Sequence, residues 1–132
     1  MERLTGSFKV MGWDEHPYDE APSVPMLAHA VVTHELSGDI EGEASITYLL
    51  AYEPSAGTGA NYVGLARITG RIGDREGTFV ARDIGTFSNG LAQSCWTILP
   101  HSGTGGLCGI RGDGHFSATD SGASYSLDYE LD

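Results

Sequence analysis

The chain has 132 residues and a formal net charge of −11, with seven Lys and Arg residues against 18 Asp and Glu residues. This length suits a single domain over residues 1–132 with one hydrophobic core. Nucleic acids and anionic membranes attract clustered cations, so we expect neither as a partner. No apolar stretch approaches the roughly 20 residues of a spanning helix, and the N-terminus lacks the apolar run of a signal peptide. We therefore expect a cytoplasmic protein.

The first half of the chain alternates apolar and polar residues with a period of two, the pattern of half-buried β-strands. We expect a short strand around Phe8–Trp13, then a loop over Asp14–Pro25 that either covers a site or is a disordered spacer. The next two strands place these residues inward: Met26, Ala28, Ala30, Val32, His34 and Leu36 in one, and Ile40, Ala44, Ile46, Tyr48, Leu50 and Tyr52 in the other.

The second half continues the alternation. Tyr62 has inward parity, and Phe79 and Ala81 point inward, which carries Asp83 to the same face. In the last strand the inward residues are Tyr125, Leu127, Tyr129 and Leu131. Turns rich in Gly, Ser, Asn and Asp separate the strands at 37–39, 54–60, 73–77, 88–90, 100–106 and 120–122.

About eight short strands at this spacing predict an all-β fold, an eight-stranded antiparallel closed β-barrel, with a β-sandwich as the alternative. A closed barrel leaves no exposed sheet edge. In an open sheet rich in glycine, such an edge would be poorly protected from pairing with other chains. The glycine-rich stretch 100–114 lacks a Walker lysine and a following helix, so we interpret it as turns rather than a phosphate site.

Several short motifs follow one another along nearly the whole chain. They are Phe8-Lys9-Val10-Met11-Gly12-Trp13, Ser37-Gly38-Asp39, Tyr62-Val63-Gly64, Gly77-Thr78-Phe79-Val80, Ser102-Gly103-Thr104-Gly105 and Leu127-Asp128-Tyr129. With these motifs the sequence resembles an uncharacterised bacterial domain-of-unknown-function family that has the allene oxide cyclase-like, calycin-like β-barrel fold.

The resemblance implies an eight-stranded barrel with a pocket at one mouth, but no established reaction. The broader fold is similar to that of plant allene oxide cyclase and of bacterial cyclases in polyketide biosynthesis. Those proteins bind apolar substrates and cyclise them mainly by shaping the reactive conformer. This chain has Asp83 where we expect family members to carry His, so a family role for that position does not carry over to it.

Two residues are the candidate proton carriers. A carboxyl group among Phe79, Ala81 and the barrel aromatics loses its hydration, which raises its pKa and suits Asp83 to general acid or base catalysis. The alternative is an ordinary Asp at the barrel mouth, bonded to backbone amides or to Arg82 or Arg67. His34 is the second candidate, because an inward imidazole can move a proton near neutral pH. Its alternative is a core residue without a role.

Aromatic residues are the candidate ligand contacts. Tyr48, Tyr52 and Tyr62 would line an apolar pocket and polarise a substrate carbonyl, or simply pack the core. Trp13, Phe79 and Trp96 would form pocket walls or barrel packing.

The chain offers no signature of a metal or cofactor site. Asp14, Glu15 and His16 are adjacent rather than spaced like metal ligands. Cys95 and Cys108 are too few for a zinc site or a disulfide framework. One disulfide is geometrically possible, but two reduced, half-buried thiols suit a cytoplasmic protein better. We expect neither metal nor cofactor.

Three functions fit these patterns. The first is a cyclase or isomerase for an apolar biosynthetic intermediate, in which Asp83 moves a proton with His34 or a tyrosine. The second is a lipocalin-like protein that binds a hydrophobic small molecule without changing it. The third is a packed barrel whose outer surface forms an oligomer. We also expect a possible homo-oligomer, of symmetry that the sequence leaves open.

Overall fold

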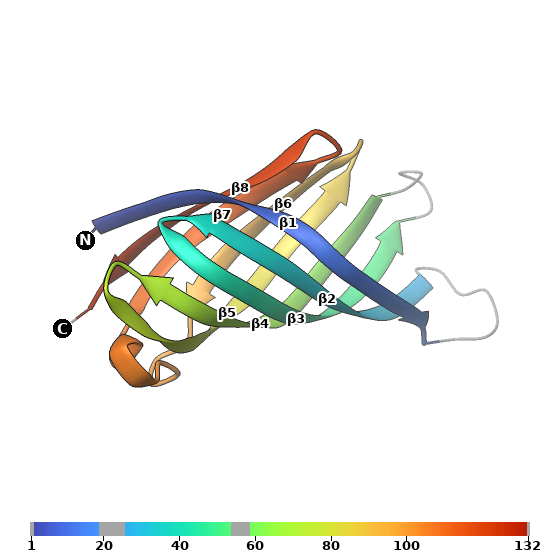
Figure 1. The fold of residues 1–132 in the computed structure, drawn as a ribbon. Helices are drawn as coiled ribbons and strands as arrows, with labels where there is room; N and C mark the ends of the chain where they lie inside the picture. Colours follow the sequence, from blue (N-terminus) through green and yellow to red (C-terminus); the bar gives the residue numbers. More distant parts are fainter. Residues whose placement is uncertain (1, 19–25, 54–58, 132) are drawn as a thin grey trace.

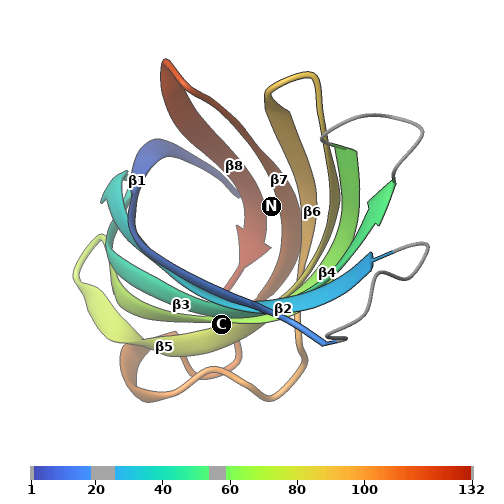
Figure 2. The same ribbon diagram turned by 90° about the vertical axis from the view of Figure 1, so that its right-hand side faces the viewer.

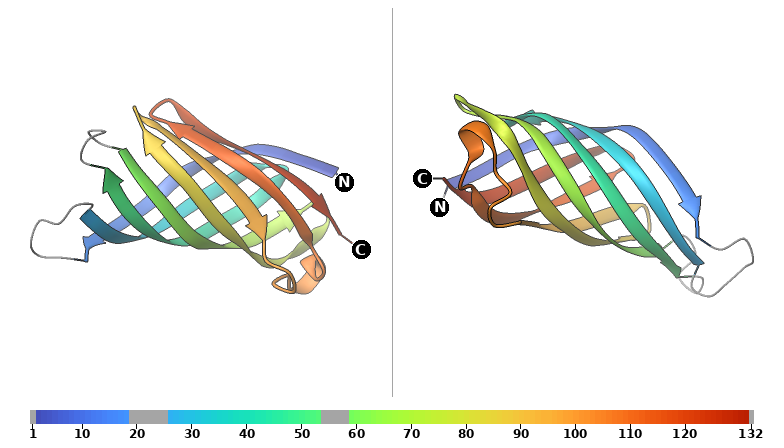
Figure 3. Two further views of the ribbon diagram at one scale, coloured as in Figure 1. Left: turned by 180° about the vertical axis from the view of Figure 1, so that it is seen from behind. Right: turned by 90° about the horizontal axis from the view of Figure 1, so that it is seen from below.

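Eight antiparallel strands form a closed barrel, as the sequence predicts (Figure 1). The computed structural model describes residues 2–18, 26–53 and 59–131. The strands are β1 (Glu2–Pro17), β2 (Met26–Gly38), β3 (Ile40–Glu53), β4 (Gly59–Ile72), β5 (Arg75–Ser88), β6 (Leu91–Ile98), β7 (Arg111–Thr119) and β8 (Gly122–Glu130). Each strand pairs with the next one along the chain, and β8 pairs with β1 to close the ring. Figure 3 shows the strands tilting around the barrel, as closure requires.

The period-two pattern explains which side chains fill the barrel. The inward sets predicted for β2 and β3 are buried, apart from Met26, which is 41% exposed, and Tyr52, which is partly buried. Both of these residues lie at strand ends, where neighbouring strands no longer cover the interior. Phe79, Ala81 and Asp83 are buried as predicted. In β8 Tyr125 and Leu127 are buried and Tyr129 is partly exposed. Leu131, predicted in the same strand, lies just after the end of β8 and is also partly exposed.

β1 is longer than the sequence suggests. Its pairing with β2 continues to the Pro17–Ala28 pair, so the loop predicted from Asp14 is wrong for residues 14–17, which belong to the strand. Pairing with β2 gives these residues the backbone hydrogen bonds that a loop would lack. Tyr18 follows the strand as a bend, and its N–H donates to the Leu27 carbonyl oxygen at 2.9 Å. Residues 19–25 of the predicted loop lie outside the described residues.

A β-bulge interrupts the β1–β2 ladder between Val10 and Gly12. The extra residue is Met11, whose side chain points to solvent. Since side chains alternate along a strand, one added residue reverses the parity of everything after it. Trp13 therefore lies opposite the buried Val32, on the inner face of the sheet.

At one end of the barrel the segment 99–110, which contains the short 3₁₀-helix η2 (Gly105–Leu107), packs against β5. Leu107 and Ile110 are each 1% exposed and join the core there. Ser102 and Thr104 fix the segment to β5, because their hydroxyl oxygens accept hydrogen bonds from the backbone N–H groups of Val80 and Thr78 at 3.0 and 3.1 Å. We call this end the closed end.

The opposite end, which we call the mouth, carries the β5–β6 and β7–β8 turns and faces the viewer in Figure 2. Asn89 and Gly90 have φ values of +53° and +78°, as a two-residue type I′ hairpin requires. No helix in the described part of the chain is long and apolar enough to cross a membrane.

The outer surface carries the side chains that alternate with the core. Leu49, Val63 and Ile84 follow one another across β3, β4 and β5 and are 43–50% exposed. Cys95 continues this row on β6, and both cysteines are free and exposed rather than half-buried. Cys95 is exposed because it lies between Ser94 and Trp96, which point inward.

Candidate functional site

The mouth contains a pocket of about 420 Å³ with mostly apolar walls, which we call the mouth pocket. This volume falls in the usual range for small-molecule sites. Its walls come from strands on all sides of the barrel. The lining residues are the aromatic Phe8, Trp13, Tyr48, Tyr52, Tyr62, Phe87 and Phe116, the aliphatic Val10, Leu50, Ala60, Ala92 and Ala118, and Gly90, His34, Thr119 and Asp120.

Five of the eight predicted site residues line this pocket: Trp13, His34, Tyr48, Tyr52 and Tyr62. The other three, Asp83, Trp96 and Phe79, are buried and are not among the described lining residues. Asp83 and Trp96 lie opposite each other on β5 and β6. Phe79 is four residues from Asp83 in the direction of the closed end.

Tyr48 connects the pocket to Asp83. Its hydroxyl donates a hydrogen bond to Asp83 Oδ2 at 2.5 Å, although the two residues are on β3 and β5. Gly64 on β4 lies between them, paired with Tyr48 on one side and with Asp83 on the other. A Cβ atom at Gly64 would approach Tyr48 Cδ1 to 2.8 Å, so the ring can cross β4 only over a glycine.

Asp83 is a buried carboxyl group with incomplete hydrogen bonding. It has no exposed surface, and its Oδ1 has no hydrogen-bond partner among the described residues. Burial raises the pKa of Asp83, while interactions with Tyr48, Ser94 and Trp96 oppose that rise. Burial, and then the charge of Asp83, keep the pKa of Tyr48 well above its ordinary value. The Trp96 indole nitrogen is also buried without a partner in the described chain.

The bond to Arg82 or Arg67 that the sequence left open for Asp83 does not form, because both arginines are exposed on the outer surface. Asp83 is thus neutralised by protonation or stabilised by hydroxyl groups, and no described residue forms an ion pair with it.

Tyr62 repeats the arrangement one strand further on. Its hydroxyl lies 2.5 Å from Ser94 Oγ on β6, across Gly85 on β5. A Cβ at Gly85 would come within 2.6 Å of the Tyr62 hydroxyl oxygen. Burial raises the pKa of Tyr62 to about 12. Tyr125 on β8 does the same near the closed end, where it crosses Gly6 and donates to the Ser37 carbonyl oxygen at 2.8 Å.

His34 lies between two aromatic rings. Phe8 stacks on the imidazole with ring centroids 4.4 Å apart, and Phe116 approaches edge-on at 6.2 Å. Burial lowers the pKa of His34 to about 4, so the ring is neutral at pH 7. Its Nδ1 is buried without a hydrogen-bond partner among the described residues.

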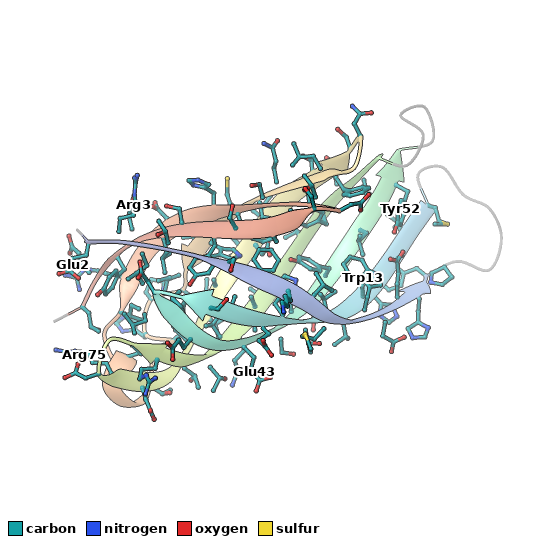
Figure 4. All side chains as sticks on the ribbon, turned by 45° about the horizontal axis from the view of Figure 1, so that its top comes forward. Glu2, Arg3, Trp13, Glu43, Tyr52 and Arg75 are labelled. Atoms are coloured by element: carbon teal, nitrogen blue, oxygen red, sulfur yellow. The ribbon has the colours of Figure 1, made fainter. Side chains whose placement is uncertain are left out.

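A carboxylate joins two aromatic residues at the rim. Glu15 accepts hydrogen bonds from Trp13 Nε1 at 2.8 Å and from the Tyr52 hydroxyl at 2.5 Å. Burial, and then Glu15, raise the pKa of Tyr52 to about 12. In Figure 4 Trp13 and Tyr52 lie toward the same end of the barrel. The bulge at Met11 makes this contact possible, because it turns both Trp13 and Glu15 to the inner face.

The neighbours of Glu15 point away from the pocket. Asp14 Oδ1 and His16 Nε2 lie 3.0 Å apart, both exposed on the outer face. Three adjacent residues on a strand alternate in direction, so Asp14, Glu15 and His16 do not converge on one point. The described residues contain no group of three or more His, Cys, Asp or Glu side chains arranged to hold a metal ion.

The structure adds residues that the sequence analysis missed. Ser94 shares the inward parity of Trp96, which is a signal that the pattern does carry. Phe8 and Phe116 could be assigned inward by the same rule. Glu15 gave no usable signal, since its direction depends on the bulge.

The fold and the site define a class: a small closed antiparallel barrel with an apolar pocket at one mouth, above buried polar groups. The chain belongs to the family described as protein of unknown function (DUF3224), which matches residues 4–129. It is also similar to the crystal structure of a DUF3224 protein of unknown function from Shewanella oneidensis MR-1, with 23% identity and a TM-score of 0.81. That match covers 100% of this chain and 98% of the other, and at this identity it shows a shared fold. No curated protein matches the chain.

Proposed function

We propose that the protein is a cyclase or isomerase that acts without a cofactor on an apolar biosynthetic intermediate bound in the mouth pocket. The observation that carries this proposal is the Tyr48–Asp83 pair, a buried carboxyl group joined to a tyrosine of the pocket wall. A buried carboxyl group destabilises a barrel core unless it is fully paired. A protein that only packs its interior has no need of it. The likeness of the sequence to allene oxide cyclase-like barrels supports the same class of reaction.

Most of the proposed rate enhancement comes from the shape of the pocket. Apolar walls that exclude water and hold one conformer of the ligand contribute several kcal/mol without any nucleophile. The aromatic residues from Phe8 on β1 to Phe116 on β7 supply such walls on opposite sides of the barrel.

Asp83 acts through Tyr48 in this proposal, because Asp83 itself does not reach the pocket surface. The Tyr48 oxygen takes a proton from a substrate carbon while its own proton moves to Asp83 Oδ2. The reverse transfer returns a proton to a different carbon, so an isomerisation needs no other reagent. The neutral His34 donates a hydrogen bond to a substrate oxygen, because its low pKa makes it a weak base.

A second candidate function, a lipocalin-like binding protein, is favoured by a different observation. The hydroxyl groups of all three tyrosines in the pocket wall already have partners: Asp83 for Tyr48, Ser94 for Tyr62 and Glu15 for Tyr52. Such a wall can hold a ligand without reacting with it.

Native mass spectrometry before and after incubation with an apolar cell extract separates these functions. A retained mass of a few hundred daltons that is later released as an isomer supports the cyclase or isomerase. A ligand released unchanged supports the binding protein, and a protein that stays empty contradicts both.

With a ligand identified, Tyr48→Phe and Asp83→Asn test the proton transfer. Both should lower turnover by about 10²-fold or more while binding stays within a fewfold of wild type. Unchanged turnover in either variant would overturn the assigned roles. The cytoplasmic location, the lack of nucleic-acid and membrane partners, and the homo-oligomer stay predictions.

A further inference from the structure

None of the seven Lys and Arg residues of this protein is among the described residues that line the mouth pocket. Arg3, Arg71, Arg75 and Arg111 belong to the parts of β1, β4, β5 and β7 at the closed end, and three of them form exposed ion pairs there. The other three cations, Lys9, Arg67 and Arg82, are exposed, and their neighbours Phe8, Ala66 and Ala81 are buried, so their side chains point to the outer face. Figure 4 shows Arg3 and Arg75 at the end opposite Trp13 and Tyr52. Together these are all seven Lys and Arg residues of the sequence.

The charges near the mouth pocket are negative. Asp120 lines the pocket at the β7–β8 turn, and Glu15 is bonded to two of the lining aromatics. Among the described lining residues there is no Lys or Arg. The other titratable lining groups are the three tyrosines and His34. A tyrosine is neutral at pH 7 already, and the raised pKa values keep it so, whereas His34 is neutral because burial lowers its pKa.

The deeper wall offers a neutral hydrogen-bonding group instead. His34 is only 4% exposed, lines the pocket and keeps one ring nitrogen without a partner in the described chain. A neutral imidazole both donates and accepts a hydrogen bond. It therefore matches a carbonyl or hydroxyl oxygen and gives a carboxylate no compensating charge.

We infer that the mouth pocket selects uncharged, mostly apolar molecules with one carbonyl or hydroxyl group and excludes carboxylates, sulfonates and phosphates. This inference rests on the proposed function, since it assumes that the pocket binds small molecules. An anion that enters apolar surroundings without a cation loses its hydration, and no opposite charge compensates that loss. Asp120 and Glu15 add repulsion at the entrance.

The test compares ligands that differ only in charge. The neutral fluorescent naphthyl ketone prodan is titrated with the protein at pH 7, and decanol or decanoate is then added as a competitor. We expect decanol to displace prodan with an apparent Kd at least about tenfold lower than that of decanoate, a difference of about 1.4 kcal/mol. Equal displacement by the two competitors would overturn the inference and leave the proposed function standing. If neither prodan nor decanol binds, the proposed function fails together with the inference.

A charge reversal at the rim locates the effect. Asp120→Lys places a cation at the pocket and should strengthen decanoate binding by about tenfold relative to decanol binding in the same variant. The matched control is Glu43→Lys, which makes the same change of charge at an exposed residue of β3 (Figure 4). If both variants strengthen decanoate binding equally, the selectivity comes from the net charge of the protein, and the assignment to the pocket is wrong.

Discussion

His34 is the residue whose ionisation most directly opposes the fold. Its ring is stacked on Phe8, and burial lowers its pKa from 6.5 to about 4. Below pH 6.5 the unfolded chain binds a proton at this residue, whereas the folded protein does not until about pH 4. The stability that the neutral ring contributes is therefore complete above pH 6.5 and is lost as the pH falls from 6.5 toward 4.

Replacing His34 with Phe should make the free energy of unfolding less dependent on pH between pH 6.5 and pH 4. The variant keeps an aromatic ring between Phe8 and Phe116 but has nothing to protonate. Each pKa unit is worth about 1.4 kcal/mol, so the wild type should lose about 3 kcal/mol more than the variant between pH 7 and pH 4. Urea unfolding at several pH values in this range measures the difference.

The control is His115→Ala, which removes an exposed imidazole. If this variant loses the same part of the pH dependence, His34 is not its source. Asp83 contributes with the opposite sign, since its raised pKa makes stability fall as the pH rises above 3.8. That contribution is present in the wild type and in both variants and cancels from the comparison.

At the level of the strand, a single residue decides which side chains form the rim. The bulge at Met11 directs Trp13 and Glu15 inward, and their contact with Tyr52 depends on it. Deleting Met11 together with Gly12 should remove the bulge, place Trp13 opposite Thr33 and turn both Trp13 and Glu15 to the outer face. Prodan binding should then weaken by about tenfold or more, because the pocket loses a wall.

Met11→Ala is the matched control, because it changes the side chain and keeps the number of residues. It should bind prodan as the wild type does, since Met11 itself is 61% exposed. Equal loss of binding in Met11→Ala would show that the side chain, rather than the bulge, matters. Far-ultraviolet circular dichroism checks that both proteins keep their β-structure.

The sequence predicts the strands and their inward faces better than their positions along the barrel. Alternation is a local property, so His34, Tyr48 and Asp83 could each be assigned inward from their neighbours. The depth of a residue depends on the register between strands, which no single strand encodes. Phe79 and Trp96 were therefore expected at the pocket, although both lie in the core below it.

The pairing of Tyr48 with Asp83 was out of reach for the same reason. The two residues are 35 positions apart and meet only because β3, β4 and β5 align them with Gly64. The bulge was also invisible, because a break in alternation at Val10-Met11-Gly12 can be assigned only against its partner strand.

At the scale of the whole molecule, one end of the barrel contributes to stability and the other contains the pocket. The closed end is filled by Leu107 and Ile110 from a segment tied to β5, and the mouth holds the pocket. Leu107→Ala should lower the free energy of unfolding by about 2–5 kcal/mol, as expected for a fully buried leucine. Urea unfolding at pH 7 measures it.

The same variant should bind prodan within about twofold of the wild type at a temperature where it is folded, since the pocket does not include Leu107. A higher Kd for prodan together with a normal unfolding curve would show that the closed end and the pocket are coupled. Cys108→Ala is the control in the same segment, because its side chain is exposed.

The tyrosines that cross glycines have a consequence for how this sequence can vary over time. Tyr48 and Gly64, Tyr62 and Gly85, and Tyr125 and Gly6 are each one unit divided between two strands. In a relative that has lost the tyrosine, the position of the glycine can take any β-forming residue. A relative that keeps the tyrosine must also keep the glycine. Substitutions at these positions should therefore be correlated in pairs, and a set of diverged relatives would reveal the strand register of the barrel from their sequences alone.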